Sequence, residues 1–200
     1  MANIVLNSAI RTISGGLDGF VYRQHPDGRV TIARSRTPNP DRVPTPAQAQ
    51  HLKSFRAASA QCDNLMKDAA ILALYKQIVV RRGSAARVRS TIIGDILKPP
   101  EIDNLDVSGY HGALGNPIHV LAEDNIGVAR ITLSITDDAT GQVVESAEKL
   151  YTGGSLVPPP AGLWAYQSTG SLPAGHSPLV TATAYDLAGN KTELSKPMPG

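Results

Sequence analysis

The chain has 200 residues, 42% of them hydrophobic and 18% charged, a composition typical of a globular protein with one large domain or two small ones. Its formal net charge is only +2, and its single cysteine, Cys62, excludes an internal disulfide. No apolar run approaches the roughly 18 residues of a membrane-spanning helix.

A basic β-hairpin is the first strongly predicted element. Residues 19–35 contain two β-rich runs around a Pro-Asp-Gly turn at residues 26–28, where proline fixes φ and glycine accepts the left-handed conformation. Before the hairpin, residues 4–13 have the character of a short strand, and we interpret residues 14–16 as a flexible link. A hairpin alone is barely stable in water, so we expect this one to pack against another surface.

A proline-rich connector at residues 37–48 leads into a predicted helix. Thr45 is a suitable N-cap residue and Pro46 a suitable first helical residue. Apolar residues then recur at three- and four-residue spacing, as on one face of a helix, and this pattern predicts that Cys62 is a buried, unreactive thiol.

Two further helices are predicted before the sequence changes character. A helical pattern follows Asp68 and closes on two arginines and Gly83, an ordinary helix end. A shorter helix is expected over residues 85–97. It meets a Pro-Pro pair, which we take as the boundary between a region of residues 1–98 and a region of residues 99–200.

From Glu101 onward the sequence consists of short strand-like runs separated by Gly, Asn, Pro and Asp. Six or seven such strands at this spacing predict a β-sandwich. Apolar and polar residues alternate over residues 131–136 and again over residues 180–185, as half-buried strands require. Trp164 is expected at the centre of the core, and residues 152–163 as the longest flexible loop.

Two motifs in this region resemble those of a bacterial immunoglobulin-like module. They are AEDNIGVARITLSI at residues 122–135 and ATAYDLAGNKTE at residues 182–193. The resemblance covers about residues 99–199, and it implies that Asp186 and Asn190 brace the loop before the last strand, with Gly189 supplying an unusual backbone conformation. Such modules serve as spacers, adhesins and parts of appendages and virions, so the resemblance implies a fold and leaves the function open.

The front half is similar to small uncharacterised bacterial and phage-associated proteins that have a basic hairpin, a proline-rich link and a Thr-Pro-Ala-Gln helix start, here residues 45–48. No activity follows from that similarity. The predicted fold is therefore an α+β front half, with a β-hairpin and two or three helices, followed by an all-β immunoglobulin-like sandwich.

Calcium is the first ligand to consider, because Glu123, Asp124 and Asp186 are expected near one end of the sandwich. Calcium takes six to eight oxygen ligands, usually from closely spaced carboxylates, and no Asp-x-Asp-x-Asp-Gly run is present. We therefore interpret these residues as solvated turn acids. The five histidines lack zinc spacing, and the chain shows no phosphate-binding loop, nucleophile elbow or pair of catalytic acids. We expect no metal, no cofactor and no enzymatic activity.

Charge is distributed unevenly along the chain. Residues 1–98 carry 15 Lys and Arg against 6 Asp and Glu, a net of +9, and residues 99–200 carry 4 against 11, a net of −7. A basic front half is compatible with nucleic-acid binding, although aromatic residues for base stacking are few and the acidic half would repel a polyanion. The candidate basic contact residues are Arg23, Arg29, Arg34, Arg81 and Arg82.

These features favour a non-enzymatic structural or attachment subunit of a bacterial or phage-derived extracellular assembly. The hairpin, the preceding strand-like segment and the opposite charges would serve contacts with further copies or with other subunits. Residues 1–16 lack the layout of a signal peptide, so we expect cytoplasmic synthesis and release by lysis or a specialised route.

Three alternatives remain open. The first is a compact monomer whose basic and acidic faces neutralise each other, and the second is a nucleic-acid-binding module. The third is a carbohydrate- or receptor-binding module with Trp164, Tyr166 and Tyr151 as stacking groups, although we expect Trp164 in the core.

Overall fold

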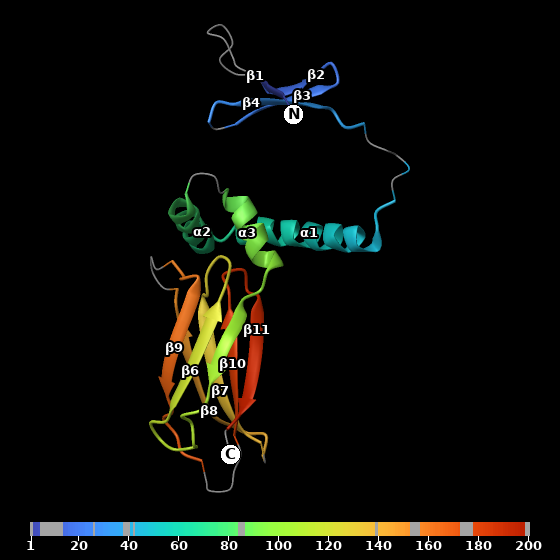
Figure 1. The fold of residues 1–200 in the computed structure, drawn as a ribbon. Coiled ribbons are helices and arrows are strands. Elements are labelled where there is room, and N and C mark those ends of the chain that lie inside the picture. The colour runs from blue at the N-terminus through green and yellow to red at the C-terminus, as the bar shows by residue number, and fades with distance from the viewer. Residues whose placement is uncertain are drawn as a thin grey trace. The chain divides into compact units, whose positions relative to one another are not determined.

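The structure is a computed structural model, and it describes residues 2–4, 14–25, 27–37, 41, 43–83, 87–138, 140–152, 157–172 and 178–198. The chain forms two compact units, Met1–Thr45 and Pro46–Gly200. Within the described ranges it contains three helices, all mid-chain, and three antiparallel sheets, which confirms a mixed α+β protein (Figure 1). No helix in those ranges is long and apolar enough to cross a membrane.

The first unit is a four-stranded antiparallel sheet in the order β1-β4-β3-β2. Its strands are β1 (Ala2–Ile4), β2 (Gly15–Leu17), β3 (Phe20–Gln24) and β4 (Val30–Arg34).

The predicted hairpin is confirmed, because β3 pairs with β4 from Phe20↔Arg34 to Gln24↔Val30. The interpretation of residues 14–16 as a flexible link is wrong. Asp18 and Gly19 adopt positive φ values of 49° and 77°, and this tight turn folds β2 back onto β3. Of the predicted strand at residues 4–13, residues 5–13 lie outside the described ranges.

The second unit begins with α1 (Pro46–Leu65), α2 (Ala69–Arg82) and α3 (Val88–Leu97). The predicted start of the first helix at Pro46 is confirmed. The Asp68 carboxylate caps α2 by accepting hydrogen bonds from the N–H groups of Ala70 and Ile71 at 2.8 and 3.1 Å, and Gly83 ends that helix at φ 92°. For the third helix, residues 84–86 of the predicted range lie outside the described ranges.

The strands that follow form two antiparallel sheets, β5-β6-β9 and β11-β10-β7-β8. All the predicted strand-like runs are confirmed as strands. Their bounds are β5 (Glu101–Asp106), β6 (Pro117–Glu123), β7 (Arg130–Asp137), β8 (Val143–Leu150), β9 (Ala161–Gln167), β10 (Pro178–Tyr185) and β11 (Lys191–Pro197).

Both of these sheets contribute side chains to one apolar core. From one sheet come Val120 and Trp164, which are cross-strand partners, and from the other come the alternating residues of β7 and β10. Trp164 is 8% exposed, which confirms its predicted place in the core. The buried alternating residues are Ile131, Leu133, Ile135, Val180, Ala182 and Ala184.

A second core joins the helices to loops at one end of these sheets. Cys62 of α1, Tyr75 of α2 and Ile92 of α3 pack in the same cluster as Ile126, which follows β6. Cys62 is therefore buried, as predicted, and burial raises the pKa of its thiol. The helices belong to the same compact unit as β5–β11, and the division between units falls at Thr45, whereas the sequence-based boundary lies at residues 98–99, where α3 gives way to β5.

Candidate functional site

Three loops at one end of the C-terminal sheets contact the helices (Figure 1). They comprise residues 124–129, 157–160 and 186–190, and we call them the helix-facing loops. Side chains of the helices donate hydrogen bonds to their backbone carbonyls: Gln61 to Ala188 at 3.3 Å, Arg81 to Pro158 at 3.0 Å, and Arg82 to Asn125.

Three aspartates meet where the helices cover these loops, and we call them the aspartate cluster. Asp95 lies on α3, Asp124 follows β6 and Asp186 follows β10, and one carboxylate oxygen from each lies within 4.8 Å of the others. Their exposed fractions are 0%, 8% and 4%. The prediction that Asp124 and Asp186 are solvated turn acids is wrong, because the helices cover this end of the sheets. Glu123 is exposed and lies outside the cluster.

The carboxylates of Asp124 and Asp186 hold their own loops. Asp124 Oδ2 accepts hydrogen bonds from the backbone N–H groups of Ile126 and Gly127 at 2.6 and 2.7 Å. Asp186 accepts from the backbone N–H of Asn190 at 2.8 Å and from its side-chain amide at 2.7 Å. The loop before the last strand thus has the bracing that the motif implies, with Gly189 at φ 91°.

Asp95 connects the cluster to the helices. Its Oδ2 accepts a hydrogen bond from the hydroxyl of Tyr75, which is fully buried on α2. The helix-facing loops also bind the backbone of α3. The side-chain amide of Asn190 donates to the Asp95 carbonyl at 2.9 Å, and that of Asn125 donates to the Gly94 carbonyl at 3.2 Å. The cluster is therefore part of the junction between helices and sheets.

Burial dominates the electrostatics of the cluster. It raises the pKa of Asp95 to about 8, with further increases from Asp186 and Asp124 and a decrease from the Tyr75 hydrogen bond. It also raises the pKa of Asp186 to about 6, against the hydrogen bonds of Asn190, which lower it. Burial and the neighbouring Asp95 charge raise the pKa of the Tyr75 hydroxyl as well.

Asp95 and the role of Tyr75 were missed by sequence reasoning. Tyr75 fits the apolar pattern of its helix, and nothing in the sequence distinguishes it from a core aromatic. Asp95 carried a usable signal, because an acid stands between isoleucines in the otherwise apolar Ile-Ile-Gly-Asp-Ile-Leu segment at residues 92–97. A charged side chain on the buried side of a helix is rare unless it has a partner.

Gly127 has a packing role beside the cluster. A Cβ at this position would lie 2.8 Å from the Pro158 carbonyl oxygen and 2.9 Å from two of its side-chain carbons. We expect Gly127→Ala to destabilise the protein by about 1–3 kcal/mol, because the loop of residues 157–160 must move away from Asp124. Urea unfolding followed by circular dichroism measures this, with Gly94→Ala as the control, because a Cβ at Gly94 would meet nothing within 4 Å and its φ is not positive. Equal losses in the two variants would contradict the packing role.

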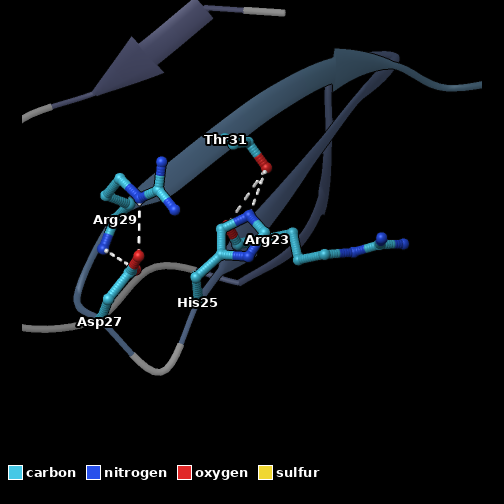
Figure 2. A network of polar contacts seen from close by, with 5 residues as sticks. All are labelled: Arg23, His25, Asp27, Arg29 and Thr31. Atoms are coloured by element: carbon cyan, nitrogen blue, oxygen red, sulfur yellow. Dashed lines mark hydrogen bonds and ion pairs between the residues drawn. The ribbon is translucent and has the colours of Figure 1, made fainter. Parts of the chain in front are cut away.

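The five predicted arginines are divided between the two compact units. Arg23, Arg29 and Arg34 lie on or beside the β3–β4 hairpin, whereas Arg81 and Arg82 end α2. Figure 2 shows the hairpin turn, where Arg29 binds Asp27 through its Nε at 2.7 Å and its backbone N–H at 3.1 Å. These contacts hold the pKa of the Asp27 carboxyl below its usual value.

The charge asymmetry changes when it is counted by compact unit. Residues 1–45 carry 6 basic and 3 acidic residues, a net of +3, and residues 46–200 carry 13 and 14, a net of −1. Most of the basic and acidic residues behind the asymmetry thus lie together in the second unit. There Arg81 and Arg82 donate hydrogen bonds to the helix-facing loops. A binding role for the five arginines stays a prediction.

The aromatic side chains considered for sugar stacking have internal contacts. Trp164 and Tyr166 pack edge to face with ring centroids 5.3 Å apart, and the Tyr166 hydroxyl donates to Glu145. Tyr151 packs beside Gly162, where a Cβ would lie 3.0 Å from its ring.

No protein-family model and no curated protein matches the sequence.

Proposed function

We propose that this chain is a non-enzymatic structural or attachment subunit of a bacterial or phage-derived extracellular assembly. In this proposal, β5–β11 form an immunoglobulin-like sandwich, and the N-terminal sheet binds a second copy of the chain or a neighbouring subunit. The observation that carries the proposal is the apolar face of the N-terminal sheet.

Cross-strand pairing places apolar side chains on one face of that sheet. Leu17 is paired with Phe20, and Tyr22 with Ile32, and partners in a sheet project from the same face. Val30, two residues from Ile32 on β4, lies on this face too. Arg34 and Gln24, the partners of Phe20 and Val30, share this face. We call its five apolar residues the apolar face.

Part of this face is exposed: Tyr22 and Ile32 are half-buried, and two further apolar side chains are open to solvent. Leu17 is 61% and Phe20 37% exposed, and Val30 is the single buried hydrophobic side chain among the described residues of the first unit. Strands need a shared hydrophobic layer to be stable, and a unit of 45 residues buries little surface alone. A partner surface on the apolar face would supply that layer.

The strand arrangement of the second unit supports the sandwich part of the proposal. Seven antiparallel strands divide into sheets of three and four that share one core. Immunoglobulin-like sandwiches have this division and about 100 residues. Such a scaffold carries loops for binding and requires no catalytic group.

Light scattering on the purified protein tests the self-association. We expect multimers whose dissociation constant rises at least tenfold in a Leu17→Ser, Phe20→Ser double variant, because two apolar side chains at the contact are lost. Val21→Ser is the matched control: Val21 is 38% exposed, as Phe20 is 37%, but projects from the opposite face. Its association should be unchanged.

A wild-type protein that stays monomeric at all concentrations and salt conditions contradicts the proposed self-association. A mobility shift of random-sequence DNA by that monomer, weakened by salt and by Arg23→Ala, would support the nucleic-acid alternative instead.

A further inference from the structure

Two carboxylate oxygens in the aspartate cluster have no hydrogen-bond donor among the described residues. They are Oδ1 of Asp95 and Oδ1 of Asp124, on side chains whose residues are 0% and 8% exposed. A buried carboxylate normally accepts hydrogen bonds or faces a cation, because desolvation of an unpaired charge costs several kcal/mol. The remaining oxygens of both carboxylates accept from Tyr75 and from loop N–H groups. The Ala188 N–H also faces the Asp95 carboxylate and lowers its pKa, without making a hydrogen bond of normal geometry to Oδ1.

The geometry of the cluster suits one small cation. Each aspartate offers an oxygen, and these oxygens lie within 4.8 Å of one another. Calcium binds oxygen at roughly 2.3–2.6 Å, so ligands on opposite sides of one ion lie about 5 Å apart. Opposed ligands of magnesium lie closer, at about 4.2 Å.

The ligand chemistry selects a hard cation. All three candidate ligands are carboxylates, and none of the described histidines, nor Cys62, belongs to the cluster. Carboxylate oxygen is the preferred ligand of calcium and magnesium, whereas zinc and copper favour imidazole and thiolate.

We propose that Asp95, Asp124 and Asp186 bind one calcium ion at the junction between α3 and the helix-facing loops. The ion takes one oxygen from each carboxylate, including the two that have no donor. It thereby replaces the repulsion between three buried acids with attraction to a shared positive charge.

A pocket beside the cluster is lined in part by Asp124. The pocket has a volume of about 220 Å³ and is lined by Lys98, Pro99, Glu101, Glu123, Asp124 and Asn125. Three of these residues are acids and one is basic, so the pocket favours a cation. Asn125 adds a further buried side-chain oxygen without a donor, Oδ1, while its amide holds the Gly94 carbonyl.

The proposed ion links separate parts of the second unit. Asp95 comes from a helix and the other two ligands come from loops after β6 and β10. A ligand that binds only the folded state stabilises it by mass action. Calcium binding should therefore strengthen the attachment of the helices to the sheets.

Calorimetric titration of the full chain tests the site. After treatment with EDTA and removal of the chelator, calcium chloride should bind at one equivalent with a dissociation constant of about 10⁻⁵ to 10⁻³ M, and magnesium chloride at least tenfold more weakly. Asp95→Asn and Asp124→Asn should each weaken calcium binding at least tenfold. Glu193→Gln, which removes an exposed acid on β11, should change it less than twofold.

Thermal unfolding is a second measurement, which detects calcium binding through its effect on stability. Calcium well above its dissociation constant should raise the wild-type melting temperature by about 5 °C, and should raise that of Asp95→Asn clearly less. Circular dichroism establishes that each variant is folded.

Several results would overturn the proposal. They are absence of saturable wild-type binding up to about 10 mM calcium, tighter binding of magnesium than of calcium, and equal weakening by Glu193→Gln. A cluster that holds only a shared proton would bind neither ion and show no melting shift, and that outcome excludes the calcium site.

Discussion

Without divalent cations, Asp95→Asn should raise the free energy of unfolding at pH 8 by several kcal/mol. Burial raises the pKa of Asp95 from 3.8 to about 8, so between these values the folded chain holds a proton that the unfolded chain has released. Asp95 alone then lowers wild-type stability as pH rises through this window, by about 1.4 kcal/mol per pH unit at most. Asp186, whose pKa is raised to about 6, adds to the fall in the lower part of the window in both proteins. Asparagine resembles the protonated acid and carries no such dependence.

Burial sets this direction, and the neighbouring acids Asp186 and Asp124 add to it because they disfavour the Asp95 charge. The Tyr75 hydroxyl and the Ala188 N–H favour the charged form and lower the pKa, but burial outweighs them. In the variant, the amide oxygen can accept from Tyr75 while the amide nitrogen donates toward the other two carboxylates.

Urea unfolding in EDTA at pH values from 4 to 8.5 measures the effect. Wild type and Asp95→Asn should converge near pH 4 and diverge steadily above it. Asp103→Asn, which changes an exposed acid on β5, serves as the control and should follow the wild type. A wild-type free energy of unfolding that is equal at pH 5 and pH 8 would show that Asp95 ionises freely in the folded protein.

Trp164→Ala should cost about 3–5 kcal/mol of stability, since it removes the largest side chain of the core between the two C-terminal sheets. Trp164 is 8% exposed, pairs with Val120 and packs against Tyr166, so its neighbours cannot close the space that it leaves. Circular dichroism is the suitable probe because the chain has one tryptophan.

Leu163→Ala is the matched control for this prediction. Leu163 precedes Trp164 on β9, faces the other side of the strand and is 62% exposed. Its replacement should change stability by about 0.5 kcal/mol or less. A comparable loss in both variants would mean that strand propensity, and not core packing, decides the stability of β9.

Local patterns predict most of the secondary structure of this chain. Period-two alternation identifies β7 and β10, and terminal residues identify the start of α1 and the end of α2, because both signals arise within a few residues of the element. Local patterns do not predict the strand β2. Two of its three residues are glycines, so it carries no side-chain pattern, and pairing with β3 alone defines it.

The aspartate cluster depends on long-range packing that no local pattern contains. The motifs around Asp124 and Asp186 place both residues in loops, and their convergence is foreseeable from that. Their burial is not, because it depends on where α3 lies, and Asp95 joins them from a helix that precedes the sheets. An acid in an apolar helix is the one sequence signal of that relationship.

The last turn of α3 has an uncommon kind of cap. Helix ends leave backbone carbonyls without helical partners, and here the amides of Asn125 and Asn190, from the loops after β6 and β10, donate to the carbonyls of Gly94 and Asp95. The Asp95 carbonyl also accepts from the Lys98 N–H at 3.2 Å. Main-chain atoms offer the same acceptor whatever side chain the residue carries, so a substitution at position 94 should leave these hydrogen bonds intact. A single-residue insertion in α3 would rotate the turn by about 100° and remove them. The cap therefore depends on the length of α3 more than on the side chain at position 94.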